Sequence, residues 1–115
     1  MTPTPKRLGA AAGGGTLATA ANLYSASGTV DTSTVISSIV VCNAGATARK
    51  YRICVSTASA TFQAGSYIVY EASISPNDTI ALTLGLTMDP SARYLCVSSD
   101  HADVNFSAFG VENTP

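Results

Sequence analysis

Apolar and polar residues alternate along much of this chain, with the period of two at which a β-strand shows its side chains to opposite faces. Residues 79–85 are the clearest case, because small or polar residues separate Ile80, Leu82 and Leu84. Residues 48–57 alternate in the same way. No segment has a convincing helical period, so the pattern predicts a chain of strands and turns.

Seven segments carry this alternation or the β-branched and aromatic composition of buried strands. They are residues 16–24, 34–43, 48–57, 66–72, 79–85, 92–99 and 104–111. Turn-forming residues separate them, notably Pro76 at the second position of residues 75–78, where its fixed φ suits a type I or type II turn. This spacing predicts an all-β fold, an antiparallel β-sandwich or jelly-roll-like barrel of about seven or eight strands.

Residues 1–15 depart from the strand pattern. Pro3 and Pro5 give the chain an extended start, and residues 9–15 (GAAAGGG) have the composition of a flexible hinge. We therefore expect residues 1–15 to form a flexible N-terminal arm, ordered only against a neighbouring molecule. Residues 16–115 are expected to form the β-sandwich domain.

The chain carries few charges for its size. Of its 115 residues, 46% are hydrophobic and 11% are charged, whereas about 25% is the usual charged share. A surface this poor in charge either aggregates or is covered by a partner, which is a first indication of an assembly subunit. The net charge of −1 lacks the basic footprint of a nucleic-acid binder, and no apolar run is long enough to span a membrane. We expect neither partner.

The cysteines give no sign of a disulfide framework or a zinc site. Cys42, Cys54 and Cys96 are odd in number, widely spaced and without a CxxC motif. Each lies inside an apolar or alternating stretch, which predicts free core thiols in a protein assembled in a reducing cytoplasm.

Catalytic chemistry has few candidates in this sequence. His101 is the only histidine, and all five aspartates fall in predicted turns, where Asp commonly bonds to local backbone. Asp100, His101 and Asp103 are either a metal-binding cluster or the tip of a hairpin. We predict no catalytic residue, cofactor or metal, and a protein that is not an enzyme.

Several residues are better candidates for a protein interface. Glu71 ends an apolar strand, and it is either an exposed residue or the partner of Arg52 or Arg93 in an ion pair across a subunit interface. Lys6 and Arg7 are either solvated or in contact with an acidic partner surface.

Aromatic residues add two further candidates. Phe106 and Phe109 are offset by three positions, so on one strand they face opposite sides and only one enters the core. We expect Tyr70 and Phe109 to pack against another subunit.

Four packing and turn patterns run between residues 34 and 111. They are VISSIVVCN at 35–43, YRICV at 51–55, YEASISPNDTIALTLGL at 70–86 and VNFSAFG at 104–110. Together they resemble a group of small β-rich virion proteins of tailed bacteriophages, the capsid decoration (cement) proteins and the distal domains of fibre and tail proteins. These patterns specify a fold better than a role.

The resemblance implies a β-sandwich that assembles as a homotrimer and has no catalytic residue. A short arm ahead of the domain favours a decoration protein that binds the major capsid protein on the outer capsid surface, after assembly in the host cytoplasm. The alternative is a tail, baseplate or fibre component that contacts a host-surface glycan. The interface residues expected for either role are Lys6, Arg7, Arg52, Tyr70, Glu71, Arg93 and Phe109.

Overall fold

The computed structural model describes residues 2–12, 15–26, 33–88 and 94–114 of the chain. Every helix or strand in these ranges is a β-strand. The eight strands are β1 (Thr2–Ala12), β2 (Ala21–Ser25), β3 (Ser33–Asn43), β4 (Arg49–Ser56), β5 (Tyr67–Ile74), β6 (Thr79–Met88), β7 (Tyr94–Ser99) and β8 (Val104–Thr114).

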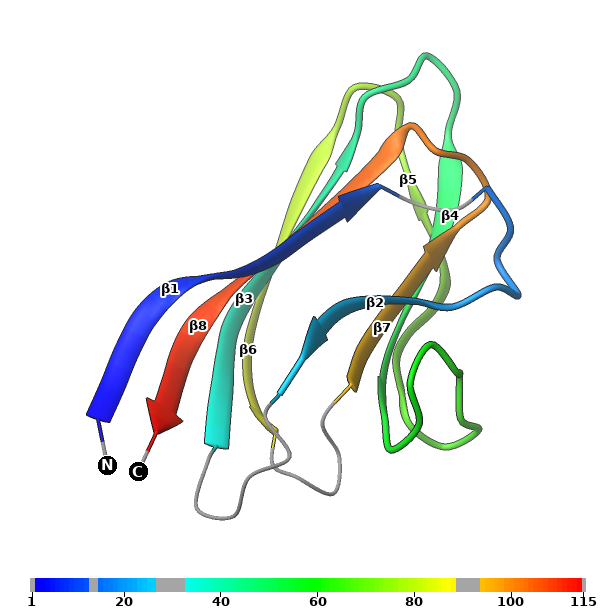
Figure 1. The fold of residues 1–115 in the computed structure, drawn as a ribbon. Helices are drawn as coiled ribbons and strands as arrows, with labels where there is room; N and C mark the ends of the chain where they lie inside the picture. Colours follow the sequence, from blue (N-terminus) through cyan, green and yellow to red (C-terminus); the bar gives the residue numbers. More distant parts are fainter. Residues whose placement is uncertain (1, 13–14, 27–32, 89–93, 115) are drawn as a thin grey trace.

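The strands form two four-stranded antiparallel sheets that pack face to face (Figure 1). Sheet A has the order β1-β8-β3-β6, and sheet B has the order β2-β7-β4-β5. Strands pair as nested partners, β1 with β8, β2 with β7, β3 with β6 and β4 with β5. This nesting is the arrangement of a jelly roll, so the all-β sandwich predicted from the alternation is confirmed.

The core lies between the two sheets, and it is built from the inward positions of the alternating strands. Phe106 of sheet A and Tyr51 of sheet B meet edge to face, with ring centroids 6.2 Å apart. Around them pack fully buried aliphatic side chains, among them Ile36, Ile39, Val41, Ile53, Ile74, Leu95, Val97 and Val104. Burial of this apolar surface is the main force that holds one sheet on the other.

The expectation of a flexible arm over residues 1–15 is wrong for the part that the structure describes. Strand β1 pairs with β8 along its whole length, from Thr2 opposite Thr114 to Ala12 opposite Asn105. Prolines are compatible with this position because β1 is an edge strand, and an edge leaves one row of backbone N–H groups unpaired.

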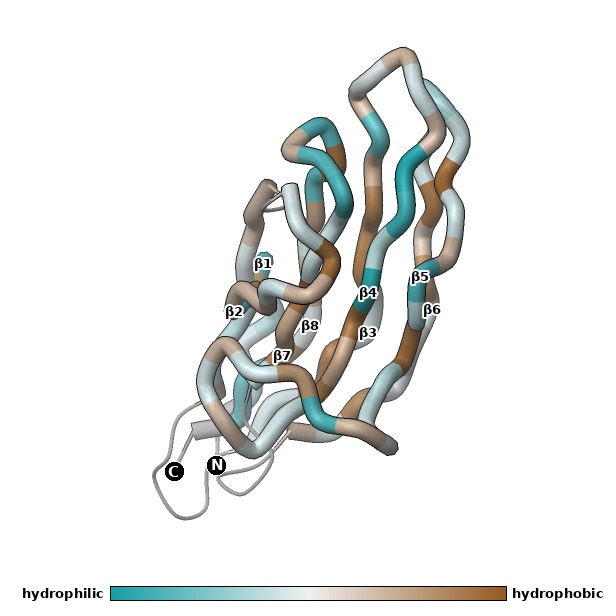
Figure 2. The backbone as a smooth tube through the Cα atoms, turned by 90° about the vertical axis from the view of Figure 1, so that its right-hand side faces the viewer, coloured by the Kyte–Doolittle hydropathy of each residue, from teal (hydrophilic) through white to brown (hydrophobic). Residues whose placement is uncertain are grey.

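The small residues of β1 serve close packing and not flexibility. Gly9 lies so near β2 that a Cβ atom there would be 2.1 Å from the carbonyl oxygen of Leu23. Leu8 and Ala11 pack against the core. The glycine and alanines therefore let β1 close one side of the sandwich, where β1 and β2 lie together, while β5 and β6 lie at the opposite side (Figure 2).

Candidate interaction surface

An irregularity in edge strand β5 creates the most distinctive surface of the molecule. Tyr51 of β4 lies opposite Ala72, and Ile53 lies opposite Val69, so the single residue Arg52 faces two residues of β5. These two residues are Tyr70 and Glu71. The extra residue is a β-bulge, and Glu71 accommodates it with a φ of 53°, a conformation that is uncommon for a residue other than glycine.

The bulge brings the side chains of both residues to the Arg52 guanidinium. Arg52 Nη2 donates a hydrogen bond to the Glu71 carboxylate and lies 3.4 Å from the Tyr70 hydroxyl. The guanidinium carbon is 4.6 Å from the centroid of the Tyr70 ring, 5.7 Å from that of Phe62 and 5.9 Å from that of Tyr67. We call these five residues the Arg52 cluster.

The rings of the Arg52 cluster also contact one another. Tyr67 and Tyr70 pack edge to face with centroids 4.8 Å apart, and Phe62 and Tyr67 are 5.4 Å apart. Aromatic rings and a guanidinium at these distances attract each other through cation–π and edge-to-face contacts. The cluster therefore holds its side chains in place before any partner arrives.

The Arg52 cluster is partly open to solvent. Tyr70 is 59% exposed, and its neighbour Ile68, which occupies a second register shift of β5, is 39% exposed. The hydrogen bond from Arg52 lowers the pKa of the Glu71 carboxyl, and the same bond raises the pKa of the guanidinium. Both side chains are thus charged at neutral pH beside an exposed aromatic ring.

Glu71 and Arg52 form their ion pair within one chain. The sequence suggested that Glu71 pairs with Arg52 or Arg93 across a subunit interface, and this expectation is corrected for Arg52. The reason is topological, since β4 and β5 are neighbours in sheet B and the bulge places the two side chains side by side. Arg93 lies outside the described residues.

A second exposed aromatic lies on the other sheet. Phe106 is 1% exposed and Phe109 is 37% exposed, so the predicted division of these two rings between core and surface is confirmed. Cross-strand partners point to the same face of a sheet. Phe109 therefore shares its face with a set of residues that we call the Phe109 face: Pro5, Arg7, Val35, Ser38, Val40, Ser107 and Val111.

The Phe109 face is nearly uncharged. Arg7 is its one charged member, directly opposite Phe109 on β1. Tyr70 belongs to sheet B and Phe109 to sheet A, so the two aromatics expected at subunit contacts lie on different sheets. The molecule thus has two separate aromatic surfaces.

Lys6 is held by its own chain. It forms an ion pair with Glu112 of β8, and Glu112 also accepts a hydrogen bond from the hydroxyl of Tyr24. The hydrogen bond from Lys6 is the main cause of the lowered pKa of Glu112, and burial together with Glu112 raises the pKa of Tyr24 to about 12. Tyr24 further bonds to Thr34 at 2.8 Å, so this group joins sheet B to sheet A.

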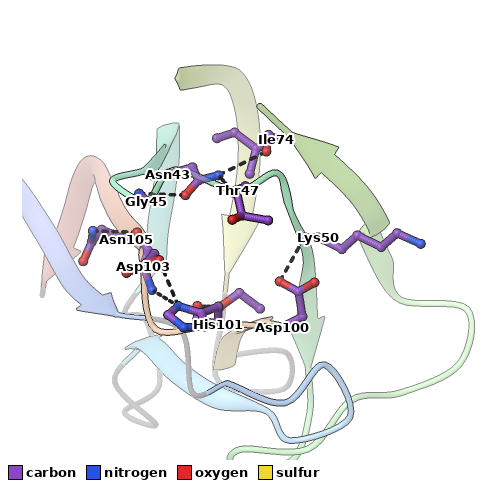
Figure 3. A network of polar contacts seen from close by, with 10 residues as sticks. Asn43, Gly45, Thr47, Lys50, Ile74, Asp100, His101, Asp103 and Asn105 are labelled. Atoms are coloured by element: carbon purple, nitrogen blue, oxygen red, sulfur yellow. Dashed lines mark hydrogen bonds and ion pairs between the residues drawn. The ribbon is translucent and has the colours of Figure 1, made fainter. Parts of the chain in front are cut away.

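Residues 100–103 are part of a polar network at one end of the sandwich (Figure 3). Asp100 Oδ1 accepts a hydrogen bond from the backbone of Lys50, and His101 Nδ1 accepts one from the backbone of Asp103 at 3.1 Å. His101 and Asp103 thus bond within a turn. Among the described residues, no group of three or more His, Cys, Asp or Glu side chains is placed to hold a metal ion.

Asn43 makes a second group of hydrogen bonds at the same end of the sandwich (Figure 3). This residue is fully buried, and its amide nitrogen donates to the carbonyl oxygens of Thr47 at 2.8 Å and Ile74 at 3.2 Å (Figure 3). Its amide oxygen accepts from the backbone of Gly45 at 3.0 Å. Asn43 therefore fastens the end of β3 to the end of β5 across the two sheets.

The three cysteines are free, as predicted. Cys54 and Cys96 are buried and lie opposite each other on β4 and β7, whereas Cys42 is only partly buried. Burial raises the pKa of the Cys96 thiol, which lowers the fraction of reactive thiolate.

Two members of the Arg52 cluster were missed at the level of sequence. Phe62 and Tyr67 have no pattern that assigns them to the surface around Arg52, because Phe62 lies in the loop between β4 and β5. One signal in the sequence could have found them: the aromatics Phe62, Tyr67 and Tyr70 lie close together along the chain.

No protein-family model, curated protein or solved structure matches this chain. In the part of the chain that the structure describes, no pocket is found. Among the described residues, no helix is long and apolar enough to cross a membrane.

Proposed function

We propose that this chain is a structural subunit of a virus particle, a decoration protein that binds the outer surface of the capsid as a homotrimer. The observation that carries the proposal is the presence of two aromatic surfaces on opposite sheets, the Arg52 cluster and the Phe109 face. A decoration protein needs two such surfaces, because it must bind its own copies and also the major capsid protein.

The two surfaces suit different contacts. The Phe109 face joins apolar side chains to serine hydroxyls and is nearly uncharged, and depletion of charge is typical of protein interfaces. The Arg52 cluster presents Tyr70 and Arg52, and tyrosine and arginine are the residue types that most often dominate the free energy of a protein contact. We assign the Phe109 face to the trimer and the Arg52 cluster to the major capsid protein.

Binding of this kind stabilises a shell by linkage. A protein that binds the assembled lattice and not the free subunits lowers the free energy of the assembled state alone. The resemblance of residues 34–111 to phage virion proteins supports the same role. The jelly roll, which recurs in viral capsid and lectin domains, agrees with it by analogy.

Locating the chain in purified particles tests the role. Electron cryomicroscopy is expected to show density for the chain on the outer capsid lattice, with copies around three-fold positions. Density on the tail alone would contradict the proposal.

The docking surface is tested by substitution. Tyr70→Ala is expected to weaken binding to empty shells by a factor of about 30, the effect of removing a dominant interface residue. Thr4→Ala, at an exposed position on the other sheet, is the matched control and is expected to bind like the wild type. Equal binding by both variants would place the docking surface elsewhere.

A second function is favoured by the same cluster. An exposed tyrosine ring beside a guanidinium offers both a stacking face and hydrogen-bond donors to a sugar, so the chain is alternatively a tail, baseplate or fibre component that binds a host-surface glycan. Reproducible binding on a glycan array, abolished by Tyr70→Ala, would favour this function over capsid decoration.

A further inference from the structure

The four edge strands of the two sheets differ in how they are protected. An unpaired strand edge invites pairing with another chain, and proteins block it with prolines, charges, bulges or short length. Strand β1 has Pro3, Pro5, Lys6 and Arg7. Strand β2 has five residues, and β5 has register shifts at two points and carries Glu71.

Strand β6 is long and lacks charges and prolines, and one register shift is its share of this protection. It extends over ten residues, TIALTLGLTM, without a charge or a proline. Among the described strands it pairs with β3 alone, at the end of sheet A (Figure 2). The β3–β6 register shifts between Ile36 and Ser38. Where burial is described, exposure still alternates along β6, with Thr79, Ala81, Thr83, Gly85 and Thr87 exposed.

The sequence of β6 is also nearly the same read in either direction. Residues 79–87 read TIALTLGLT, and reversed they read TLGLTLAIT. In an antiparallel pair of two such strands centred on Thr83, Thr79 lies opposite Thr87, Ala81 opposite Gly85 and Thr83 opposite its own copy. On the other face every Ile or Leu lies opposite a Leu. Shifting the centre by one residue places Thr opposite Ala or Gly and loses this match.

We propose that two copies of this chain associate edge to edge through β6, antiparallel and about a two-fold axis at Thr83. The pair joins two copies of sheet A into one continuous sheet. A second copy is the occupant because the sequence of β6 complements itself, which a contact with a different protein does not require. The strand carries no charge, so no like charges oppose each other, and threonine pairs across strands are favourable.

The two-fold contact goes beyond the proposed function, because a decoration trimer does not need it. It is separate from the Arg52 cluster and uses the edge of sheet A and not its outer face. If the chain is also a trimer, the contact links trimers in pairs. The purified protein is therefore expected to have an even number of chains, each of 11.7 kDa.

Charged substitutions test the contact and its register. Thr83→Lys places two lysines opposite each other and is expected to halve the native mass, measured by analytical ultracentrifugation. A mixture of the Thr83→Lys and Thr83→Glu proteins is expected to restore it. The double variant Thr79→Lys with Thr87→Glu forms two opposite-charge pairs in the proposed register and is expected to stay associated, whereas Thr79→Lys with Thr87→Lys dissociates.

The control is Thr4→Lys on β1, at an exposed position of the opposite edge of sheet A. It is expected to keep the native mass, and circular dichroism checks that every variant is folded. A wild-type protein with an odd number of chains, or one whose native mass Thr83→Lys leaves unchanged, overturns the two-fold contact. Neither result removes the chain from the capsid surface, where electron cryomicroscopy decides the proposed function independently.

Discussion

At the scale of single residues, Asn43 shows how a polar side chain is accommodated in the interior. Asn43 is buried and makes three hydrogen bonds to backbone groups. A buried polar group without partners costs about 1–3 kcal/mol, so its bonds show why an amide fits here and an aliphatic side chain does not.

Substitution of Asn43 tests this role. Asn43→Ala is expected to lower the free energy of unfolding by about 2–3 kcal/mol, because it removes the side-chain partner of three backbone groups. Urea denaturation followed by circular dichroism measures the loss. Asn105→Ala, at an exposed position at the same end of the sandwich (Figure 3), is the control, and an equal loss in both variants would contradict the role of Asn43.

The lowered pKa of Glu112 predicts a stability that depends on pH. A carboxyl whose pKa is lower in the folded state stabilises the fold above its unfolded pKa, near 4.5, and loses this effect as the pH falls through the folded value. Glu112→Gln is expected to be less stable than the wild type at neutral pH. The two proteins are expected to converge below the folded pKa. Urea denaturation across this range measures the gap, and a gap independent of pH would contradict the Lys6–Glu112 interaction.

At the scale of elements, β1 shows how a composition can mislead. Its glycine and alanines resemble a linker, but they allow β1 to pair with β8 and to approach β2. Strand β5 is a second example. The apolar composition of residues 66–72 predicts a strand, but it gives no sign of the two register shifts that make β5 irregular. In both cases the pairing with a neighbouring strand determines the conformation of the local residues.

Removal of β1 tests its place in the fold. Deletion of residues 1–12 is expected to lower the thermal midpoint by more than 10 °C, because it uncovers the edge of β8 and the core beneath Leu8; a loss of a few kcal/mol shifts a domain of this size by roughly 4–8 °C per kcal/mol. Differential scanning calorimetry measures the shift. An unchanged midpoint would contradict the role of β1 in the fold and would favour a flexible N-terminal arm.

At the scale of the whole molecule, the two sheets form one cooperative unit because a single core joins them. Phe106 of sheet A and Tyr51 of sheet B share this core, while Phe109, three residues along the same strand, stays at the surface. The core therefore serves stability, and the exposed aromatics remain available for partners.

The two phenylalanines make a matched pair for a test. Phe106→Ala is expected to cost about 3–5 kcal/mol through lost burial and the cavity it leaves. Phe109→Ala is expected to change the free energy of unfolding by less than about 1 kcal/mol, since its ring is already partly exposed. Urea denaturation measures both, and a cost for Phe109→Ala as large as that for Phe106→Ala would show that the Phe109 face is part of the core.

The sequence by itself determined the strands from residue 34 onward, the turn at residues 75–78 and the division between Phe106 and Phe109. These features depend on residues close together in the chain, where the period of two acts. It also singled out Arg52, Tyr70 and Glu71, although not the geometry that joins them.

Only the tertiary structure decided the place of β1 and the Arg52 cluster. Strand β1 is defined by β8, at the other end of the chain, and the cluster is defined by a bulge that no local pattern encodes. Both depend on which strands become neighbours, and that choice follows from how the whole chain buries its apolar faces.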